Sequence, residues 1–405
     1  MKKVLLLIMD GLGDLNSSEL KNKTPLQDES LDYFRWLSKN GETGLMTTID
    51  YGIVPGSDTA HLAILGYDPK KWYLGRGVYE ALGAGIELKK GDVAFRVNVA
   101  TLKNNKIIDR RAGRNDYGLK ELFSLIDGTK IGDTKIILKH TVEHRGVLVL
   151  RGSNLSNFVS ENDPHKEVKP KEIKALKNKK DAEKTAKILR ELLKKVQELW
   201  SNHKVNIERK KKGIPEANYL LIRGAGMLSK KPVSFEKKYG LKACCIAGGA
   251  LYKGVAKFLG MDILKVPGAT GDKNTNLDNK VLYSIKATKE YDFIFLHIKA
   301  TDSFGHDGKC KEKLEFLKKI NNTLKKHKIH LHFDLIVITG DHSTPCIKKA
   351  HSSDPVPLLI YGINTRKDKG LFNEIDAALG SYRIKGLDLM NIILDKIGKK
   401  EKYGS

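Results

Sequence analysis

The 405-residue sequence predicts an α/β fold, in which a mostly parallel sheet is flanked by helices and a second α+β domain is inserted into this core. Three observations predict it. Short, nearly continuous apolar runs recur along the chain, as is typical of strands buried on both faces. Helical patterns lie between these runs, so strands and helices alternate. The middle of the chain breaks this alternation with a Gly-rich segment and a long Lys- and Glu-rich stretch.

Four apolar runs, at residues 4–9, 293–298, 335–339 and 356–361, are predicted to be buried strands of a parallel sheet. In an open α/β sheet, the functional site forms beyond the carboxyl ends of the strands. We therefore expect the acids and histidines that lie next to these runs to come together. They are Asp10, Asp302, His306, Asp341, His342 and His351.

Helices are expected between the strands, and the clearest patterns cover residues 250–259, 278–287 and 311–326. Residues 75–239 are predicted to form the inserted domain, because acid and histidine motifs of the core lie on both sides of them. The core then comprises residues 1–74 and 240–405. Within the insert, we expect strands at 93–102, 136–138, 147–150 and 219–222, and a long helix at 171–200.

Composition excludes several classes of protein. No apolar run approaches the ~18 residues that a membrane-spanning helix needs, and the run at 4–9 is too short for the core of a signal peptide. The four cysteines show no C-x-x-C spacing, so the sequence implies neither a disulfide framework nor a cysteine zinc site. These features predict a cytoplasmic protein without membrane contact.

The formal net charge of +25 at pH 7 raises the question of an acidic partner. Nucleic-acid-binding proteins concentrate basic residues in patches or motifs, whereas the lysines of this chain are spread along its length. We expect solvated basic surfaces and no nucleic-acid partner, and a nucleic-acid-binding protein with a decayed enzyme fold is the alternative. A positive field also steers small phosphate anions toward a cleft. Nothing in the sequence indicates an oligomeric state.

The acids and histidines have the chemistry of metal ligands. Asp302 and His306 are four residues apart, so one helical turn places both on the same side, although this spacing alone is more often structural. The pair Asp341-His342 at a strand exit is a stronger signal, and His351 adds an imidazole from the following loop. Mixed carboxylate and imidazole ligands suit Mn²⁺ or Zn²⁺, whereas Mg²⁺ favours oxygen ligands.

Ser57 is the candidate nucleophile. It follows the turn Pro55-Gly56 and precedes a helical pattern at 58–65, so it is expected at a helix N-terminus. Free amides and the helix dipole favour a bound phosphate there. The alternative interpretation is a serine that only caps the helix, which is the commonest reason for a serine in that place.

The residues around Ser57 resemble a known family. The segment 54–69, VPGSDTAHLAILGYDP, resembles the nucleophile segment of the archaeal 2,3-bisphosphoglycerate-independent phosphoglycerate mutases, which belong to the alkaline phosphatase superfamily. The segments DRRAGR at 109–114 and NDPH at 162–165 resemble the substrate-domain motifs of this family. Its metal motifs are matched in chain order by MDG at 9–11, KATDSFGHDG at 299–308, TGDHSTP at 339–345 and His351.

This resemblance covers nearly the whole chain and implies an alkaline-phosphatase-like core with a mobile substrate domain. It implies two divalent ions, with Mn²⁺ expected first and Zn²⁺, Mg²⁺ or Co²⁺ as alternatives, and no bisphosphoglycerate. One ion is expected on Asp10, Ser57, Asp341 and His342, and the other on Asp302, His306 and His351. The substrate-binding residues implied are Arg111, Arg114 and Arg223, with looser matches at Arg145, Asp163, His165 and Lys253.

The activity implied is the interconversion of 3-phosphoglycerate and 2-phosphoglycerate through a phosphoserine at Ser57. Asp163 is the candidate for the proton transfers of glycerate, and His165 or a group beside the ions is the alternative. Arginines suit the grip on glycerate, because a bidentate guanidinium holds a carboxylate in one orientation. A metal-dependent phosphatase on the same core is the alternative activity, since water that reaches the phosphoserine hydrolyses it.

Overall fold

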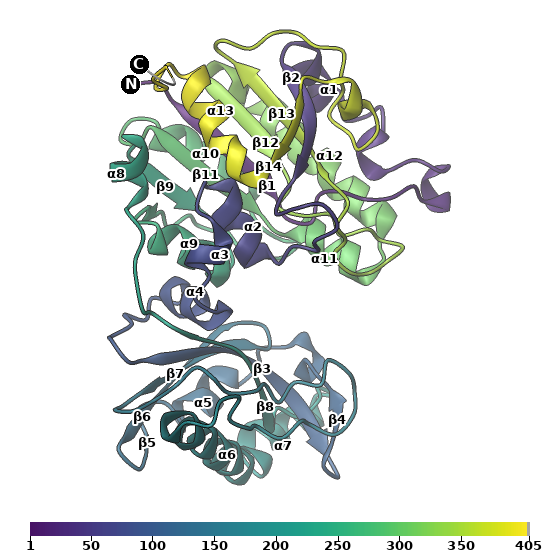
Figure 1. The fold of residues 1–405 in the computed structure, drawn as a ribbon. Coiled ribbons are helices and arrows are strands. Elements are labelled where there is room, and N and C mark those ends of the chain that lie inside the picture. Colours follow the sequence, from purple (N-terminus) through teal and green to yellow (C-terminus); the bar gives the residue numbers. More distant parts are fainter. Residues whose placement is uncertain (403–405) are drawn as a thin grey trace. The chain divides into compact units, whose positions relative to one another are not determined.

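The computed structural model describes residues 1–402 and divides the chain into two compact units. The first unit consists of Met1–Tyr73 and Pro232–Ser405, and the second is the continuous segment Leu74–Lys231 (Figure 1). Among the described residues, no helix is long and apolar enough to cross a membrane.

The first unit is built on an eight-stranded sheet with the order β10-β9-β11-β1-β12-β13-β2-β14. The central strand β1 (Val4–Met9) pairs in parallel with β11 (Phe293–Ile298) on one side and with β12 (Leu335–Thr339) on the other. All residues of these three strands are buried, as their continuous apolar sequences predicted. The other strands are β2 (Glu42–Thr47), β9 (Ala243–Ile246), β10 (Asp262–Ile263), β13 (Val356–Gly362) and β14 (Tyr382–Lys385).

Strand β13 corrects one prediction, because it runs antiparallel to both β12 and β2. Its sequence resembles that of the parallel strands, since all of these strands are buried. The difference lies in the connection before it. Residues 340–355 form turns and isolated bridges, so the chain reverses beside β12 instead of crossing over through a helix.

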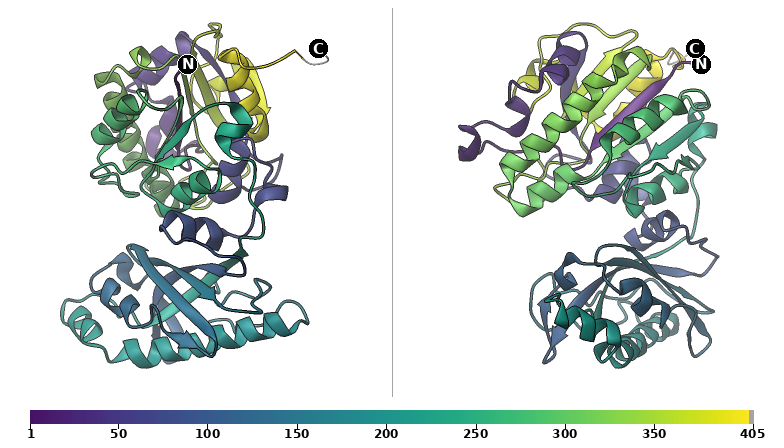
Figure 2. Two further views of the ribbon diagram at one scale, coloured as in Figure 1. Left: turned by 90° about the vertical axis from the view of Figure 1, so that its left-hand side faces the viewer. Right: turned by 180° about the vertical axis from the view of Figure 1, so that it is seen from behind.

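Helices cover both faces of this sheet. On one face, α10 (Leu277–Ala287) and α12 (Cys310–Lys326) share a hydrophobic core with α1 (Asp32–Lys39) and with Leu5 and Leu7 of β1, and they stand in front in the right-hand view of Figure 2. Figure 1 shows α2 (Ser57–Ile64), α9 (Ala250–Phe258) and α13 (Leu389–Lys396) on the opposite face. The remaining helices of this unit are α3 (Pro69–Trp72), α8 (Phe235–Tyr239) and α11 (Ala300–Asp307).

The second unit is an antiparallel sheet covered by helices. The strand order is β4-β3-β7-β6-β5, and β8 also pairs with β3, along residues 93–100. The strands are β3 (Val93–Lys103), β4 (Lys106–Asp109), β5 (Lys130–Ile131), β6 (Thr134–Val142), β7 (Arg145–Arg151) and β8 (Tyr219–Met227). The helices are α4 (Arg76–Gly83), α5 (Leu119–Ser124), α6 (Lys180–Ser201) and α7 (Lys204–Lys211). The predicted α/β fold with a mostly parallel sheet and an α+β insert is therefore confirmed.

Two boundaries differ from the sequence prediction. Helix α6 begins at Lys180, not near residue 171, because the preceding residues pair with another segment: the amide of Leu176 donates to the carbonyl of Phe158 at 2.8 Å. Residues 232–239, which we assigned to the insert, lie in the first unit. There the ring centroids of Phe235 and Phe293 are 4.8 Å apart.

Candidate active site

The Ser57 side chain lies at the first turn of helix α2. Gly56 is the N-cap residue, and Ser57 follows it as the first helical residue. The interpretation of Ser57 as a capping serine is therefore wrong. Its hydroxyl is buried and lies 3.2 Å from Nε2 of His342, so it points to a group of acids and histidines rather than to its own helix.

Asp10, Asp341 and His342 form a first group of ligands beside Ser57. Asp10 follows β1 and the pair Asp341-His342 follows the neighbouring strand β12, so the sheet brings them together. Nε2 of His342 lies 3.4 Å from Oδ1 of Asp10 and 3.3 Å from Oδ2 of Asp341. All three side chains are buried. Among the described residues, neither of these two carboxylate oxygens has a hydrogen-bond partner.

The electrostatics of this first group favour a bound cation. Burial and the charge of Asp341 raise the pKa of Asp10, and burial likewise raises the pKa of Asp341. Burial and His351 lower the pKa of His342 to about 3, so its imidazole is neutral and can act as a ligand. Two buried carboxylates that repel one another, each with one oxygen that lacks a hydrogen bond among the described residues, fit a divalent ion, whose charge would neutralise both.

Asp302, His306 and His351 form a second group. Asp302 and His306 lie one turn apart on α11, as their spacing predicted, with 3.3 Å between Nε2 of His306 and Oδ1 of Asp302. Nε2 of His351 lies 3.6 Å from the same oxygen. In each histidine the other ring nitrogen faces a backbone carbonyl: Nδ1 of His306 lies 3.1 Å from that of Lys349, and Nδ1 of His351 lies 2.9 Å from that of Pro55. This arrangement fixes both rings with Nε2 toward Asp302, as in metal-bound histidines.

The two groups adjoin one another. The rings of His342 and His351 are stacked, with centroids 3.6 Å apart. The hydroxyl of Thr344 donates to Oδ1 of Asp302 at 3.0 Å and lies 3.1 Å from Nδ1 of His342. His342 is within ligand distance of both groups, and we assign it to the first because its Nε2 faces Asp10 and Asp341. The site therefore has donors for two neighbouring ions, which fits the predicted pair.

Four residues that the sequence analysis did not single out surround these groups. The ammonium group of Lys299 lies 2.8 Å from Oδ2 of Asp302, and the hydroxyl of Tyr252 donates to Oδ2 of Asp10. Nε2 of His297 lies 3.5 Å from that same oxygen, and Nδ1 of His61 lies 2.6 Å from the carbonyl oxygen of Ser57. Lys299 and His61 lie within the quoted motifs, so proximity in sequence could have indicated them. No local pattern distinguishes Tyr252 or His297.

The second unit contains a concentration of arginines. Arg96 on β3 is paired in register with Arg223 on β8, and Arg145 begins the neighbouring strand β7. Burial and the charges of Arg76 and Arg223 lower the pKa of Arg96 well below its usual range. The Nε groups of Arg96, Arg145 and Arg223 are buried without a hydrogen-bond partner among residues 1–402. Unpaired guanidinium donors of this kind fit an anionic ligand with several oxygens. Arg96 was missed because a lone arginine in a strand carries no motif.

Asp163 is buried beside these arginines. Arg110 binds both of its carboxylate oxygens, with Nη2 at 2.9 Å and 2.8 Å, and Nη1 of Arg223 lies 3.8 Å from Oδ2. Burial alone would raise the pKa of Asp163, but these hydrogen bonds and charges hold it below the ordinary value. His165 is half exposed, and its Nε2 lies 2.9 Å from Glu161. Asp163 is therefore held as a carboxylate ion.

The remaining predicted substrate residues are not all in one place. Arg111 and Arg114 are exposed on the turn that follows β4. Lys253 lies on α9, in the first unit, whereas all the predicted substrate arginines lie in the second. The structure thus brings the predicted metal ligands together with Ser57 in the first unit, and it gathers Arg145, Arg223 and Asp163 in the second.

Comparisons with known proteins agree with this geometry. The family described as 2,3-bisphosphoglycerate-independent phosphoglycerate mutase matches residues 38–206. The chain is 47% identical to 2,3-bisphosphoglycerate-independent phosphoglycerate mutase 1 of Methanocaldococcus jannaschii, over 100% of this chain and 99% of that protein. It is 44% identical to the 2,3-bisphosphoglycerate-independent phosphoglycerate mutase of Thermoplasma volcanium, over 100% of this chain and 99% of that protein.

Two solved structures resemble the fold over nearly the full length of both chains. A protein from Pyrococcus horikoshii is 39% identical with a TM-score of 0.84, covering 100% of this chain and 99% of that chain. A cofactor-independent phosphoglycerate mutase from Thermoplasma acidophilum is 35% identical with a TM-score of 0.67, covering 98% and 99%. On the strength of the full-length identity and the site geometry, this chain belongs to the family of 2,3-bisphosphoglycerate-independent phosphoglycerate mutases.

Proposed function

We propose that this chain interconverts 3-phosphoglycerate and 2-phosphoglycerate, with Ser57 as the residue that carries the phosphoryl group between the two half-reactions. The observation that carries the proposal is the position of the Ser57 hydroxyl, buried at the first turn of a helix and 3.2 Å from a ligand of the first acid and histidine group. In this family the reaction is independent of 2,3-bisphosphoglycerate, so the phosphoryl group that Ser57 receives comes from the substrate itself.

Two divalent ions complete the proposed site. We assign one ion to Asp10, Ser57, Asp341 and His342, and the other to Asp302, His306 and His351. The mixture of carboxylates and imidazoles favours Mn²⁺, and Zn²⁺, Co²⁺ and Mg²⁺ are the alternatives. When bound, such ions lower the pKa of a serine hydroxyl and neutralise the charge that develops on phosphoryl oxygens.

Ser57 provides the nucleophile, and helix α2 positions it. The Ser57 hydroxyl attacks the phosphorus in line, the bond to the substrate oxygen breaks, and glycerate is released from the phosphoryl group but not from the enzyme. Ser57 is the first residue of α2, and at a helix N-terminus the helix dipole and free amides favour the negative charge of a phosphoserine. The other hydroxyl of glycerate then takes the phosphoryl group back.

We propose that arginines of the second unit bind the phosphate and carboxylate of the substrate. The Nε groups of Arg145 and Arg223, which are buried without a hydrogen-bond partner among residues 1–402, support this role. Arg96 joins them, since its Nε also lacks a hydrogen bond there and only lies 4.0 Å from Oε1 of Glu80. Arg111 and Arg114 offer further guanidinium groups from an exposed turn. We include His165 and Lys253 in the substrate-binding set from the family resemblance alone.

Asp163 is proposed to assist the proton transfers of glycerate. Its ion pair with Arg110 keeps it ionised, and therefore in the form that accepts a proton from a hydroxyl group. For glycerate to be rephosphorylated, water must be kept from the phosphoserine, because its hydrolysis is phosphatase chemistry.

The basic net charge of +25 draws an anionic substrate toward the site, and we expect no nucleic-acid partner. The four cysteines are all free, which fits a reducing compartment, so we place the enzyme in the cytoplasm.

The product formed from 3-phosphoglycerate tests this proposal. The Mn²⁺-loaded protein is incubated with 3-phosphoglycerate and followed by ³¹P NMR, with and without a chelator. We expect 2-phosphoglycerate with little inorganic phosphate, and no conversion after chelation. Stoichiometric release of inorganic phosphate would instead identify a phosphatase. Conversion that continues in the chelator would overturn the assignment of the two ions.

A further inference from the structure

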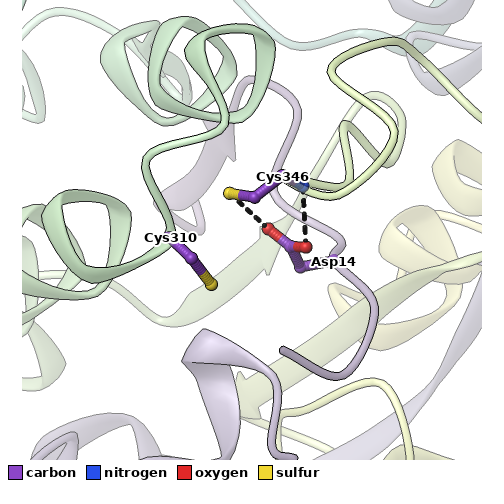
Figure 3. A group of neighbouring side chains, drawn as sticks. All are labelled: Asp14, Cys310 and Cys346. Atoms are coloured by element: carbon purple, nitrogen blue, oxygen red, sulfur yellow. Dashed lines mark hydrogen bonds between the residues drawn. The ribbon is translucent and has the colours of Figure 1, made fainter. Parts of the chain in front are cut away.

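Asp14, Cys310 and Cys346 form a third group of possible metal ligands, outside the two groups described above. Figure 3 shows these three side chains converging from three different segments of the chain. One ligand atom from each lies within 4.8 Å of the others, and all three residues are buried. None of them takes part in the phosphoryl transfer proposed here.

The contacts within this third group are specific. Sγ of Cys346 lies 3.2 Å from Oδ2 of Asp14, and the amide of Cys346 donates to Oδ1 of Asp14 at 3.0 Å. Sγ of Cys310 lies within 4.8 Å of the ligand atoms of both Asp14 and Cys346. The ammonium group of Lys313, which is also fully buried, lies 2.8 Å from Oδ2 of Asp14. Both sulfur atoms and the carboxylate therefore already face one another.

We propose that Asp14, Cys310 and Cys346 bind a thiophilic divalent cation, represented by Zn²⁺, as a structural site separate from the two ions of the active site. Thiolate ligands select Zn²⁺ over the ions that carboxylates and water prefer. Zinc bond lengths of ~2.3 Å to sulfur and ~2.0 Å to oxygen give a sulfur-to-oxygen separation of about 3.5 Å at a tetrahedral ion. The observed 3.2 Å between Cys346 and Asp14 is close to that separation.

The charges of this third site balance. The carboxylate of Asp14 forms an ion pair with the ammonium group of Lys313 at 2.8 Å. Binding of one divalent cation would release one proton from each thiol, so two positive charges enter as two negative charges form. The buried site stays neutral, and Lys313 remains as an outer partner that orients the carboxylate.

The position of this site in the chain suggests what it does. Asp14 comes four residues after Asp10, Cys310 comes four residues after His306, and Cys346 comes four residues after His342. Three of the segments that carry ligands of the active site therefore also carry a ligand of the third site. An ion bound there would link these three segments to one another.

No cysteine metal site was predicted from the sequence, because the four cysteines lack C-x-x-C spacing. Cys310 and Cys346 are far apart in the sequence, and the third ligand is an aspartate near the N-terminus. Only the fold brings them together. Since the site is fully buried, an ion would enter as the chain folds.

Cobalt substitution tests the proposal without relying on enzymatic activity. The unfolded protein is refolded with Co²⁺ and its absorption spectrum is recorded. Thiolate ligands give an intense sulfur-to-cobalt charge-transfer band, which the oxygen and nitrogen donors of the active site cannot give. We expect this band in the wild type and its loss, together with one equivalent of bound cobalt, in Cys310→Ser and Cys346→Ser.

Cys244→Ser is the matched control, because Cys244 is equally buried but lies on strand β9, away from this group. It should keep the charge-transfer band. A wild-type protein that folds and binds cobalt without the band overturns the proposal, even if a cysteine variant fails to fold. So does a mass two units lower than that of the dithiol, with loss of both free thiols, which would identify a disulfide between Cys310 and Cys346.

Discussion

The ammonium group of Lys299 lies 2.8 Å from Oδ2 of Asp302, in the middle of the proposed metal site. It also lies 3.3 Å from Oδ2 of Asp10. A lysine therefore stands between one carboxylate of each ligand group. Burial alone would raise the pKa of Asp302, but Lys299 and the nearby imidazoles of His306 and His351 hold it well below its usual range. The ammonium group of Lys299 thus offsets part of the negative charge of Asp10 and Asp302, which the two ions would otherwise neutralise.

Replacing Lys299 tests this relationship. In Lys299→Met the repulsion between the ammonium group and an incoming ion is removed, so we expect Mn²⁺ to bind roughly tenfold more tightly, as a few kcal/mol of like-charge repulsion allows. Isothermal titration calorimetry measures the affinity. The control is Lys257→Met, an exposed lysine on α9, which should leave the affinity unchanged. Weaker binding in Lys299→Met would mean that the lysine organises the site rather than competing for it.

The nucleophile is tested by removing its hydroxyl. Ser57→Ala should lower the rate of mutase turnover by roughly a thousandfold or more, because no phosphoserine can form. Helix α2 should remain folded, because Gly56 and not Ser57 is its N-cap. Circular dichroism and Mn²⁺ titration check the fold and the site. Substantial mutase activity with an intact fold would contradict the phosphoserine route.

The arginines are tested by their effect on substrate capture. Arg223→Ala and Arg114→Ala should each lower kcat/KM by roughly a hundredfold through loss of charge-assisted hydrogen bonds, while leaving Mn²⁺ affinity unchanged. Arg151→Ala is the matched control, because Arg151 lies in the same unit but pairs with Asp92. Steady-state kinetics and calorimetry separate the two effects. If substrate capture and metal binding fall together, the arginine is structural.

Gly11 is expected to be irreplaceable for a steric reason. Its φ is +60°, and an added Cβ would lie 2.5 Å from Oγ1 of Thr344 and 2.8 Å from Cα of Asp302. Gly11→Ala should destabilise the fold by about 1–3 kcal/mol and weaken metal binding, because Asp302 must move. Gly52→Ala is the control: Gly52 also has a positive φ, but its Cβ would meet nothing within 4 Å. Thermal unfolding of both variants should show the larger loss at Gly11.

Glu374 should make stability depend on pH. Burial raises its pKa to about 7, although Thr24 and the amide of Asp14 donate to it. Because the folded-state pKa exceeds the unfolded value, the stability that the protonated carboxyl contributes is complete below about pH 4.5 and is lost as pH rises through about 7. Glu374→Gln should flatten this decline. The melting temperature measured from pH 5 to pH 8 checks it, and an equally steep decline in the variant would contradict the assignment.

Much of the fold was predictable because strands that are buried on both faces have continuous apolar sequences. The apolar runs that became β1, β11 and β12 are continuous, since both faces of each strand are covered. The helix predicted at 311–326 is found at Cys310–Lys326. The direction of β13 was not predictable, because a buried strand has the same composition whichever way it runs. The start of α6 was missed, because a Lys- and Glu-rich segment favours a helix even where tertiary hydrogen bonds hold it extended.

Some residues of the candidate site could be predicted from the sequence, and others could not. Asp10, Asp302 and Asp341 stand out because each follows a strand, and the fold brings the ends of these strands together. Tyr252 and Arg96 do not stand out, because nothing near them in the sequence distinguishes them from other buried residues. Contacts between distant segments, such as those of Tyr252 with Asp10, exist only once the sheet has formed.

The central place of β1 has a consequence for the synthesis of the protein. Its six residues are synthesised long before its partners in the sheet, which begin at Phe293 and Leu335. During most of translation this apolar segment therefore lacks the strands that will cover its edges, and the nascent chain is exposed to aggregation through it. The insert, by contrast, is one continuous segment, so it can fold before the partner strands of β1 have been synthesised. The catalytic site, whose ligands begin at Asp10 and end at His351, can consequently be completed only late in synthesis.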